Sequence, residues 1–403
     1  MKGGRGMSIP YDALNSQQKE VISLAGDWIR DPYKQTFEIS GPAGSGKTTI
    51  VRTILQLNGI DPSSVMYLAY VGKAAMMLSL NGNDGRTIHS AIYDLVQVPV
   101  LDADGAFIYK NGRMVTRFGF KLKESLPSWV RYIVIDEGSM INEGIKKDLL
   151  SFGIPIIVLG DLNQLPPVFG DPAFLIKPDY ILTKIERQSE NDPIVILSQR
   201  AIQGDYINFG SYGDKCHVID RSKISKENMK KTMTDMDIII CGKNQTRDNI
   251  NNFYRTEIKG FRPDVPMVGD KIICRQNNWN LALDNGIHLI NGLIGYLDNM
   301  YLDTFNKRSM YIDFRPEFLQ EESFERIVMD FPYLFMPLHQ ANNQKRSYYN
   351  RFQFAYAITA HLSQGSQYGS VLVYDEVMGS RDYYMKWLYT CITRAMHTLY
   401  IWR

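Results

Sequence analysis

The sequence predicts an α/β protein with two domains, each built on a parallel β-sheet and its covering helices. A chain of 403 residues is long enough for two domains with sizeable cores. Short runs rich in β-branched residues alternate with helical patterns, which is typical of parallel sheets. A glycine-rich loop at 40–49 joins a strand pattern to a helical pattern. We expect residues 1–180 to form the first domain and residues 181–403 the second.

The composition is that of an ordinary globular protein. Hydrophobic residues make up 44% of the chain, and a net charge of +2 does not by itself indicate a polyanionic partner. No apolar run reaches membrane-spanning length, and the basic start MKGGRGMSIP has no apolar segment behind it. We therefore expect a cytoplasmic protein with no membrane association. The cysteines lie far apart and the histidines do not cluster with them, which argues against a disulfide framework or a metal site made of these residues.

The loop at 40–49, SGPAGSGKTT, has the pattern of a phosphate-binding loop. Its glycines let the backbone turn N–H groups toward phosphate oxygens, and the following helix directs its positive end at the same place. Lys47 would contact the β- and γ-phosphates, and the Thr48 hydroxyl would bind Mg²⁺. The alternative is a chance glycine-rich turn. The loop therefore predicts ATP and Mg²⁺ as cofactors, held by Gly41, Pro42, Ala43, Gly44, Ser45, Gly46, Lys47, Thr48 and Thr49.

Two carboxylates end the strand pattern of RYIVIDEGSM at 131–140. Buried carboxylates are costly unless a cation or a reaction requires them. Asp136 suits Mg²⁺ binding, whereas Glu137 can orient and deprotonate an attacking water. The alternative is a solvated strand end.

A polar side chain follows the next strand pattern, IPIIVLGD, in the loop LNQLPPV. Gln164 lies where it could reach a γ-phosphate from beside the acidic strand, and the two prolines after it stiffen the loop. Arg187 and Arg394 are the cations that we expect to stabilise charge on the leaving γ-phosphoryl group. The alternative for either arginine is a surface salt bridge.

The second half of the chain repeats the strand patterns without a second glycine loop. Buried-strand candidates are MDIIICGKN at 236–244, SVLVYDE at 370–376 and TLYIWR at 398–403. One glycine loop in two α/β domains suggests that the second domain supplies cations across a cleft.

The order of these motifs resembles superfamily 1 helicases, specifically the RecD/Dda-like branch, superfamily 1B. The quoted matches are LNSQQ (14–18), GPAGSGKTT (41–49), AYVGKAA (69–75), GRTIHS (85–90), VIDEGSM (134–140), GDLNQLPPV (160–168), ERQSENDPIVILSQRAIQGD (186–205), AYAITAHLSQGSQYGSVLVYDE (355–376) and YTCITRA (389–395). The resemblance implies two RecA-like motor domains and an ATP-dependent DNA helicase that moves 5′-to-3′ on single-stranded DNA. It also implies that Gln18 reads adenine and that Gly365 lies at the nucleotide.

The resemblance implies partners as well. We expect the protein to bind single-stranded DNA and single-strand/duplex junctions as a monomer, beside replication or recombination proteins, in a bacterial or phage-infected cell. The side chains expected to contact DNA are Lys73, Thr87, His89, Thr359 and His361; for the histidines the alternative is a structural role. Tyr70 and Val71 depart from the family pattern, which has Pro and Thr there, so a hydroxyl expected near the DNA backbone is missing.

Two insertions are predicted. Residues 97–120 contain the turn signals DADG and KNG between short strand patterns, which indicates a β-hairpin. It resembles the pin that splits the duplex in this family, and the alternative is a surface hairpin with no role. Residues 266–350, with GDKIICRQNN and INGLIGYL, resemble an SH3-like β-barrel in the second motor domain.

Other functions fit the same motifs. A DNA-stimulated ATPase could remodel protein–DNA complexes without separating strands, in which case the hairpin would be dispensable. A non-enzymatic DNA-binding module on a decayed ATPase is a further possibility, but the intact set of phosphate-loop, acidic, glutamine and arginine residues argues against it.

Overall fold

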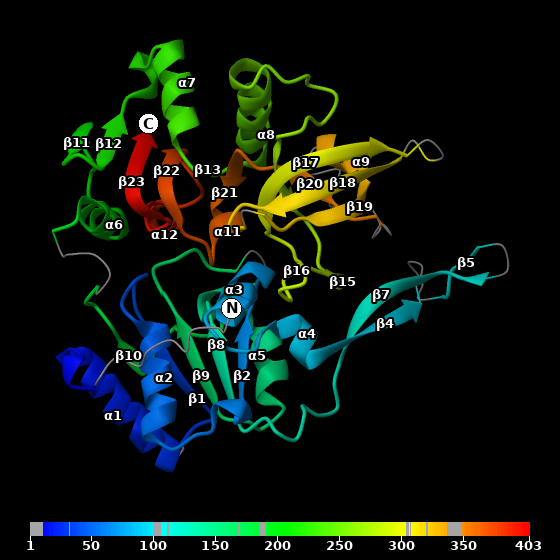
Figure 1. Cartoon of the computed structure of the whole chain (residues 1–403). Helices are drawn as coiled ribbons and strands as arrows, with labels where there is room; N and C mark the ends of the chain where they lie inside the picture. The colour runs from blue at the N-terminus through cyan, green and yellow to red at the C-terminus, as the bar shows by residue number, and fades with distance from the viewer. Residues whose placement is uncertain are drawn as a thin grey trace.

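The computed structural model describes residues 11–31, 33–99, 106–110, 113–167, 170–185, 191–303, 306, 308–319, 321–336 and 349–403. Figure 1 shows a first lobe, drawn below, and a second lobe, drawn above it, each built around a β-sheet. No helix within the described ranges is long and apolar enough to cross a membrane.

The sheet of the first lobe has strand order β10-β1-β9-β8-β2-β3, and each of these pairings is parallel. Its strands are β1 (Thr36–Ser40), β2 (Val65–Ala69), β3 (Gly85–Thr87), β8 (Tyr132–Asp136), β9 (Ile156–Gly160) and β10 (Tyr180–Ile181). The helices of this lobe are α1 (Ser16–Arg30), α2 (Lys47–Leu57), α3 (Gly72–Leu80), α4 (Ile88–Ile92) and α5 (Glu143–Leu150).

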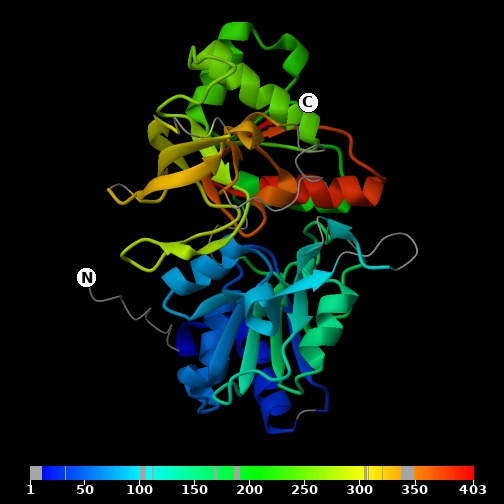
Figure 2. The ribbon, with the colours of Figure 1, turned by 90° about the vertical axis from the view of Figure 1, so that its right-hand side faces the viewer.

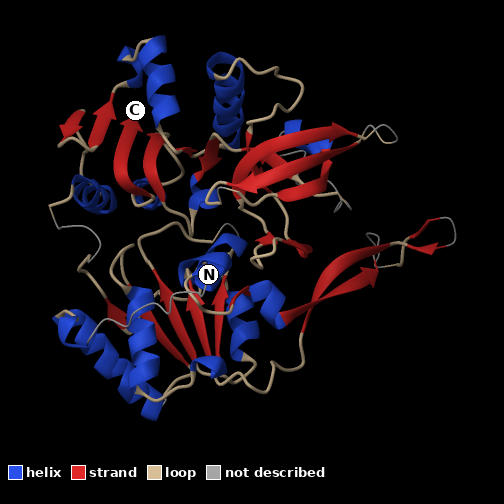
Figure 3. Cartoon of the chain, viewed as in Figure 1, coloured by secondary structure: helices blue, strands red, loops and turns tan. Residues whose placement is uncertain are grey.

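Helices cover both faces of this sheet, as the blue helices beside the red strands show in Figure 3. Alternate residues of β2 point to opposite faces. Val65 and Tyr67 pack with α1, α2 and α3, whereas Met66 and Leu68 pack with α4 and α5. Burial on both faces explains why these strands read as continuous apolar runs in the sequence.

The sheet of the second lobe has strand order β11-β12-β23-β22-β13-β21. The β11–β12 pairing is antiparallel and the other pairings are parallel. Its strands are β11 (Gly210–Tyr212), β12 (Cys216–Ile219), β13 (Ile238–Cys241), β21 (Ala357–Thr359), β22 (Tyr368–Tyr374) and β23 (Ala395–Trp402). Its helices are α6 (Pro193–Gln203), α7 (Lys226–Asp235), α8 (Asn244–Phe253), α11 (Ala360–Ser363) and α12 (Arg381–Ile392). The strands predicted at 236–244, 370–376 and 398–403 correspond to β13, β22 and β23.

An antiparallel ribbon projects from the first lobe, to the right in Figures 1 and 3. It pairs β4 (Tyr93–Pro99) with β7 (Thr116–Leu122), and a shorter pair, β5 (Tyr109–Lys110) and β6 (Arg113–Met114), lies further out. The ribbon therefore begins at Tyr93 and ends at Leu122, beyond both ends of the hairpin predicted over 97–120. Its role as a pin stays a prediction.

A further antiparallel sheet, of order β19-β18-β17-β14-β20, packs beside the second lobe. Its strands are β14 (Lys271–Cys274), β17 (Ile294–Leu302), β18 (Ser309–Pro316), β19 (Phe324–Asp330) and β20 (Phe352–Phe354). Helix α9 (Phe331–Phe335) and the small pair β15 (Asn278–Ala282) and β16 (His288–Leu289) accompany it. We call this the antiparallel unit; most of it falls in the insertion predicted over 266–350, and its likeness to an SH3 barrel stays a prediction.

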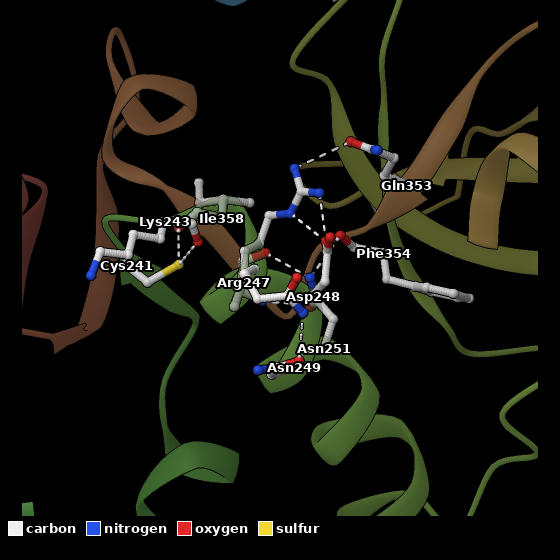
Figure 4. A network of polar contacts seen from close by, with 11 residues as sticks. Cys241, Lys243, Arg247, Asp248, Asn249, Asn251, Gln353, Phe354 and Ile358 are labelled. Atoms are coloured by element: carbon white, nitrogen blue, oxygen red, sulfur yellow. Dashed lines mark hydrogen bonds and ion pairs between the residues drawn. The ribbon is translucent and has the colours of Figure 1, made fainter. Parts of the chain in front are cut away.

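Polar contacts from α8 hold the antiparallel unit against the second lobe (Figure 4). Arg247 Nη1 donates to Gln353 Oε1 at 3.4 Å, while Asn251 Nδ2 donates to the carbonyls of Phe354 and Ala357 at 3.2 and 3.0 Å. The unit also reaches the first lobe, because a Cβ added at Gly72 would lie 3.1 Å from Ile290 Cβ.

Candidate active site

The glycine loop joins the end of β1 to the start of α2. Gly44 and Gly46 have φ of 84° and 82°, in the left-handed region that favours glycine. Gly46 immediately precedes α2, and a Cβ there would lie 2.9 Å from Gln18 Nε2. The ammonium of Lys47 donates to the carbonyls of Gly41 and Pro42, at 2.7 and 2.9 Å. Two glycines of the loop thus adopt backbone conformations that favour glycine, and phosphate binding by the loop stays a prediction.

Gln18 lies against this loop from α1. Its Nε2 donates to the Ser45 carbonyl at 3.5 Å, and its Oε1 accepts from the backbone N–H of Asn15 at 3.1 Å. The Asn15 side chain in turn accepts from the Gln18 backbone at 2.9 Å, which makes a capping box. Helix capping alone thus accounts for part of the Gln18 geometry, and adenine reading stays a prediction.

The acidic pair lies at the carboxyl end of β8. Asp136 is its last residue, and Glu137 follows with φ of 55°, a conformation that costs energy for a side chain other than glycine. Burial raises the pKa of Asp136, which the Lys47 ammonium opposes. Burial and then the Asp136 charge raise the pKa of Glu137 to about 7, although Arg394 and Lys47 act to lower it. Charges from both lobes therefore act on Glu137.

This site fits a magnesium ion. Mg²⁺ takes oxygen ligands and is commonly held by one or two protein groups plus phosphates and waters. The Asp136 carboxylate is half-buried, and loss of solvent raises its pKa, so a nearby cation would stabilise its charged form. Across the described ranges no cluster of three or more His, Cys, Asp or Glu side chains could hold a metal ion by itself. The chemistry thus fits an ion held jointly by Asp136, Thr48 and a nucleotide.

Gln164 lies in the loop after β9 and is buried. Its Nε2 is 3.4 Å from Asp161 Oδ2. In the part of the chain that the structure describes, Gln164 Oε1 is buried and accepts no hydrogen bond. A buried acceptor without a donor is costly, so this oxygen is suited to accept a hydrogen bond from a reactant.

Arg394 approaches the site from the second lobe, and only 2% of it is exposed. Its guanidinium donates to the carbonyls of Thr390 and Ser366, at 3.1 Å each, and to Thr393 Oγ1 at 3.3 Å. These contacts differ from the surface salt bridge that was the alternative for this residue. Arg187, the other predicted arginine, lies outside the described residues.

A cavity of about 30 Å³ lies where the lobes meet near the glycine loop. Pro42 and Ala43 line it from the first lobe, and Tyr389 and Thr393 line it from the second. Gly365 has φ of 70°, and a Cβ there would lie 3.1 Å from Ala74 Cβ, so this glycine permits a close approach between the lobes. The structure places Gly365 at the junction with α3.

The threonines and histidines expected to contact DNA occupy matching places in the lobes. Thr87 ends β3 and caps α4, with Oγ1 accepting from the Ser90 N–H at 3.3 Å, and Thr359 ends β21 and precedes α11. Burial lowers the pKa of both His89 and His361, which favours neutral rings at pH 7. A neutral ring fits a structural role and also a donor to a phosphate, so both alternatives for the histidines stay open.

Aromatic rings surround His89. Its ring centroid lies 5.4 Å from that of Phe120 and 5.6 Å from that of Tyr93, both on the ribbon, and 6.0 Å from that of Tyr70. Tyr70 also packs on the apolar cluster beneath α4 and α5. His361 Nε2 lies 3.4 Å from the Tyr383 hydroxyl.

Lys73 lies at the start of α3. Its Nζ is 3.8 Å from Glu317 Oε1 and 5.1 Å from the ring centroid of Tyr368. The predicted DNA-contacting lysine thus faces both the antiparallel unit and the second lobe.

Sequence reasoning missed residues at the lobe junction, chiefly Asp161 and Tyr389. The Tyr389 hydroxyl donates to Asp161 Oδ2 at 2.7 Å. Each lies inside a quoted motif, GDLNQLPPV or YTCITRA, but no local pattern pairs them.

Family models match two stretches of the chain. A model for an AAA domain covers residues 30–170, and one for a UvrD-like helicase C-terminal domain covers residues 354–402. The chain is 26% identical over 292 residues to the ATP-dependent DNA helicase dda of Enterobacteria phage T4, covering 66% of this chain and 62% of dda. It is 23% identical to the ATP-dependent RecD2 DNA helicase of Deinococcus radiodurans, and the match covers 95% of this chain and 48% of RecD2. It is 25% identical to the uncharacterised protein MJ1519 of Methanocaldococcus jannaschii, and the match covers 97% of this chain and 39% of MJ1519. The chain thus spans between 39% and 62% of the length of these relatives.

Solved structures share the fold. A structure of Pif1 helicases described for DNA unwinding at forked duplexes superposes with a TM-score of 0.56 and 17% identity, covering 96% of this chain and 91% of that one. Candida albicans Pif1 superposes with a TM-score of 0.54 and 16% identity, covering 97% of this chain and 94% of that one. Bacteroides Pif1 bound to single-stranded DNA superposes with a TM-score of 0.53 and 16% identity, covering 96% of this chain and 92% of that one. The chain therefore has a Pif1-like helicase fold of α/β class.

Proposed function

We propose that this chain, which belongs to superfamily 1B of the helicases, hydrolyses ATP to move 5′-to-3′ along single-stranded DNA and to separate duplex strands. The proposal rests on the position of Glu137 between cations of both lobes. The charges of Lys47 from the first lobe and Arg394 from the second both act to lower the pKa of Glu137. A site completed by both lobes can link hydrolysis to their relative motion.

The phosphates would be held by the loop and Lys47, which would exchange its contacts with the Gly41 and Pro42 carbonyls for phosphate oxygens. Thr48 and Asp136 would hold Mg²⁺, whose chemistry is to neutralise charge on the phosphates. Gln164 Oε1, which accepts no hydrogen bond in the described structure, would accept one from the attacking water.

Hydrolysis then proceeds by attack of this water on the γ-phosphorus. Glu137 takes the proton of the water as the new P–O bond forms, and the bond to the β–γ bridging oxygen breaks to leave ADP and phosphate. Arg394 stabilises the charge that develops on the transferred group. In other systems such an arginine contributes roughly 10³-fold or more in rate.

The strand grip would be shared between the lobes. In each lobe a threonine ends a parallel strand and a histidine follows two residues later: Thr87 and His89 in the first lobe, Thr359 and His361 in the second. Hydroxyls and neutral imidazoles at strand ends can donate to phosphate oxygens without reading sequence. Opening and closing of the nucleotide site would change the distance between the DNA-contacting residues of the two lobes.

The ribbon supports strand separation over the remodelling alternative. Leu95 and Phe120, which oppose each other across β4 and β7, are 55% and 51% exposed. Exposed apolar side chains on a ribbon beside His89 could stack on bases at a junction. Strand separation needs such a surface at the junction, whereas translocation alone does not.

Phosphate release with and without single-stranded DNA, and unwinding of 5′-tailed and 3′-tailed duplexes, test the proposal together. We expect DNA-stimulated hydrolysis that Lys47→Ala abolishes, and unwinding of the 5′-tailed duplex. Stimulated hydrolysis without unwinding would favour the remodelling translocase, and no hydrolysis at all would refute the ATPase assignment.

A further inference from the structure

Helix α12 docks on the loop that follows β9. It is red in Figure 2, where it runs along the side of the second lobe that faces the first. Lys386 Nζ donates to the Leu162 carbonyl at 3.0 Å, and the Leu165 N–H donates to Thr390 Oγ1 at 3.0 Å. Gln364 Nε2 donates to the Leu165 carbonyl at 3.1 Å. The loop that carries Gln164 is therefore held by the second lobe.

Tyr389 makes the innermost of these contacts. Its hydroxyl donates to Asp161 Oδ2 at 2.7 Å, and the two residues are 3% and 1% exposed. Burial, and then the Asp161 charge, raise the pKa of Tyr389 well above its ordinary value, so the phenol keeps its proton. Asp161 Oδ2 also lies 3.4 Å from Gln164 Nε2, and Oδ1 accepts from the Asn163 N–H at 3.0 Å.

We propose that Tyr389 is a positioning residue for ATP hydrolysis, acting through Asp161 to set the orientation of the Gln164 amide. The inference rests on the proposed function, since it specifies how the second lobe regulates the same site. A carboxylate held by Tyr389 fixes the Nε2 end of the amide. The opposite end, Oε1, is then directed away from Asp161, and it is the atom that accepts no hydrogen bond in the described structure.

The same helix end also places Arg394. The Arg394 guanidinium donates to the carbonyl of Thr390, the residue next to Tyr389. Every printed contact of the Arg394 guanidinium lies within the second lobe, so docking of α12 brings this arginine to the site, whereas the Tyr389 hydroxyl acts on the Gln164 loop. Hydrolysis would then require the docked arrangement, which explains why a buried tyrosine from one lobe bonds a buried aspartate of the other.

The test compares Tyr389→Phe with Tyr384→Phe. Tyr384 lies on the same helix and donates to both oxygens of Asp375 at 2.9 Å, so this control also loses a tyrosine–aspartate contact but leaves the Gln164 loop intact. With saturating single-stranded DNA, we expect Tyr389→Phe to lower kcat about tenfold relative to Tyr384→Phe, with KM for ATP within about twofold.

A double-mutant cycle with Gln164→Ala separates positioning from general damage. If Tyr389 acts through Gln164, Tyr389→Phe has no further effect on kcat once Gln164 is removed. A decrease of the same size in both backgrounds, or equal kcat for Tyr389→Phe and Tyr384→Phe, would overturn the inference.

Amide hydrogen exchange provides a readout that does not need hydrolysis. Because Asp161 holds the Asn163 N–H, its exchange should quicken in Tyr389→Phe but not in Tyr384→Phe. Unchanged exchange would refute the linkage between Tyr389 and this loop. Faster exchange in a protein that shows no DNA-stimulated turnover would leave the linkage standing and refute the proposed function instead.

Discussion

Lys73 Nζ lies 3.8 Å from Glu317 Oε1, so a lysine of the first lobe meets a carboxylate of the antiparallel unit. The Glu317 carboxylate also accepts from Lys271 Nζ at 3.0 Å. A phosphate that binds Lys73 must therefore compete with this carboxylate.

We expect Lys73→Ala to weaken binding of single-stranded DNA several-fold for every sequence, because a phosphate contact carries no base information. The dependence of log Kd on log salt concentration should fall by about 0.7, the value for one phosphate contact on a single strand. Fluorescence anisotropy over a range of salt concentrations measures both. Lys226→Ala, which removes an exposed lysine on α7, is the control, and an identical response in the two variants would exclude Lys73 from the interface.

Glu137 should limit activity at low pH. Its pKa of about 7 means that the carboxylate is protonated, and unable to act as a base, at lower pH. We expect kcat/KM for ATP to rise with pH through a midpoint near 7 and then to level off. We expect Glu137→Gln to lose turnover while it keeps ATP binding. Nucleotide affinity and steady-state rates between pH 5 and 9 test this, and normal turnover in Glu137→Gln would remove its assignment as the base.

The same raised pKa should cost stability at high pH. The folded protein binds this proton more tightly than the unfolded chain, so the stabilising contribution is complete below the ordinary pKa of 4.5 and is lost as the pH rises through about 7. Glu137→Gln should therefore raise Tm at pH 8 and leave it unchanged near pH 4.5. Glu124→Gln, at an exposed position, should change Tm at neither pH, and equal melting of both variants at pH 8 would contradict the burial argument.

The ribbon should be needed for unwinding but not for hydrolysis. Replacing residues 97–120 by a short Gly-Ser turn leaves the glycine loop and the acidic pair untouched, so DNA-stimulated ATPase activity should stay within a few-fold. Unwinding of a 5′-tailed duplex should be lost, because no rigid element would remain to divert one strand. Thermal melting checks the fold of the deletion variant, and undiminished unwinding would refute the pin.

Arg255 and Asp270 should contribute strongly to stability. They form a buried pair at 2.8 Å, with side chains that are 1% and 0% exposed. Arg255→Met leaves the Asp270 charge buried without its cation, so we expect the free energy of unfolding to fall by about 3–5 kcal/mol. Arg262→Met breaks a nearby pair, with Asp264, whose side chains are 68% and 64% exposed, and it should leave the denaturation midpoint unchanged. Similar midpoints for the two variants would contradict this expectation.

The sequence by itself determined the features that depend on neighbouring residues. The conformation of the glycine loop follows from Gly44, Gly46 and the strand and helix beside them, because φ preferences and helix starts are local. The continuous apolar runs predicted parallel strands for the same reason, since a strand buried on both faces needs apolar residues throughout. The hairpin was predicted too short, because Tyr93 follows α4 directly and no turn signal separates them.

Only the tertiary structure decided which residues complete the site. Asp161 and Tyr389 are 228 positions apart, and Lys73 meets Glu317 across separate units. Such pairs form when whole elements dock, and docking depends on the summed packing of many side chains rather than on any local pattern. Nothing in the sequence around Asp161 or Tyr389 indicates that they are paired. In the folded protein both are buried away from water, so each provides the hydrogen-bond partner that the other needs.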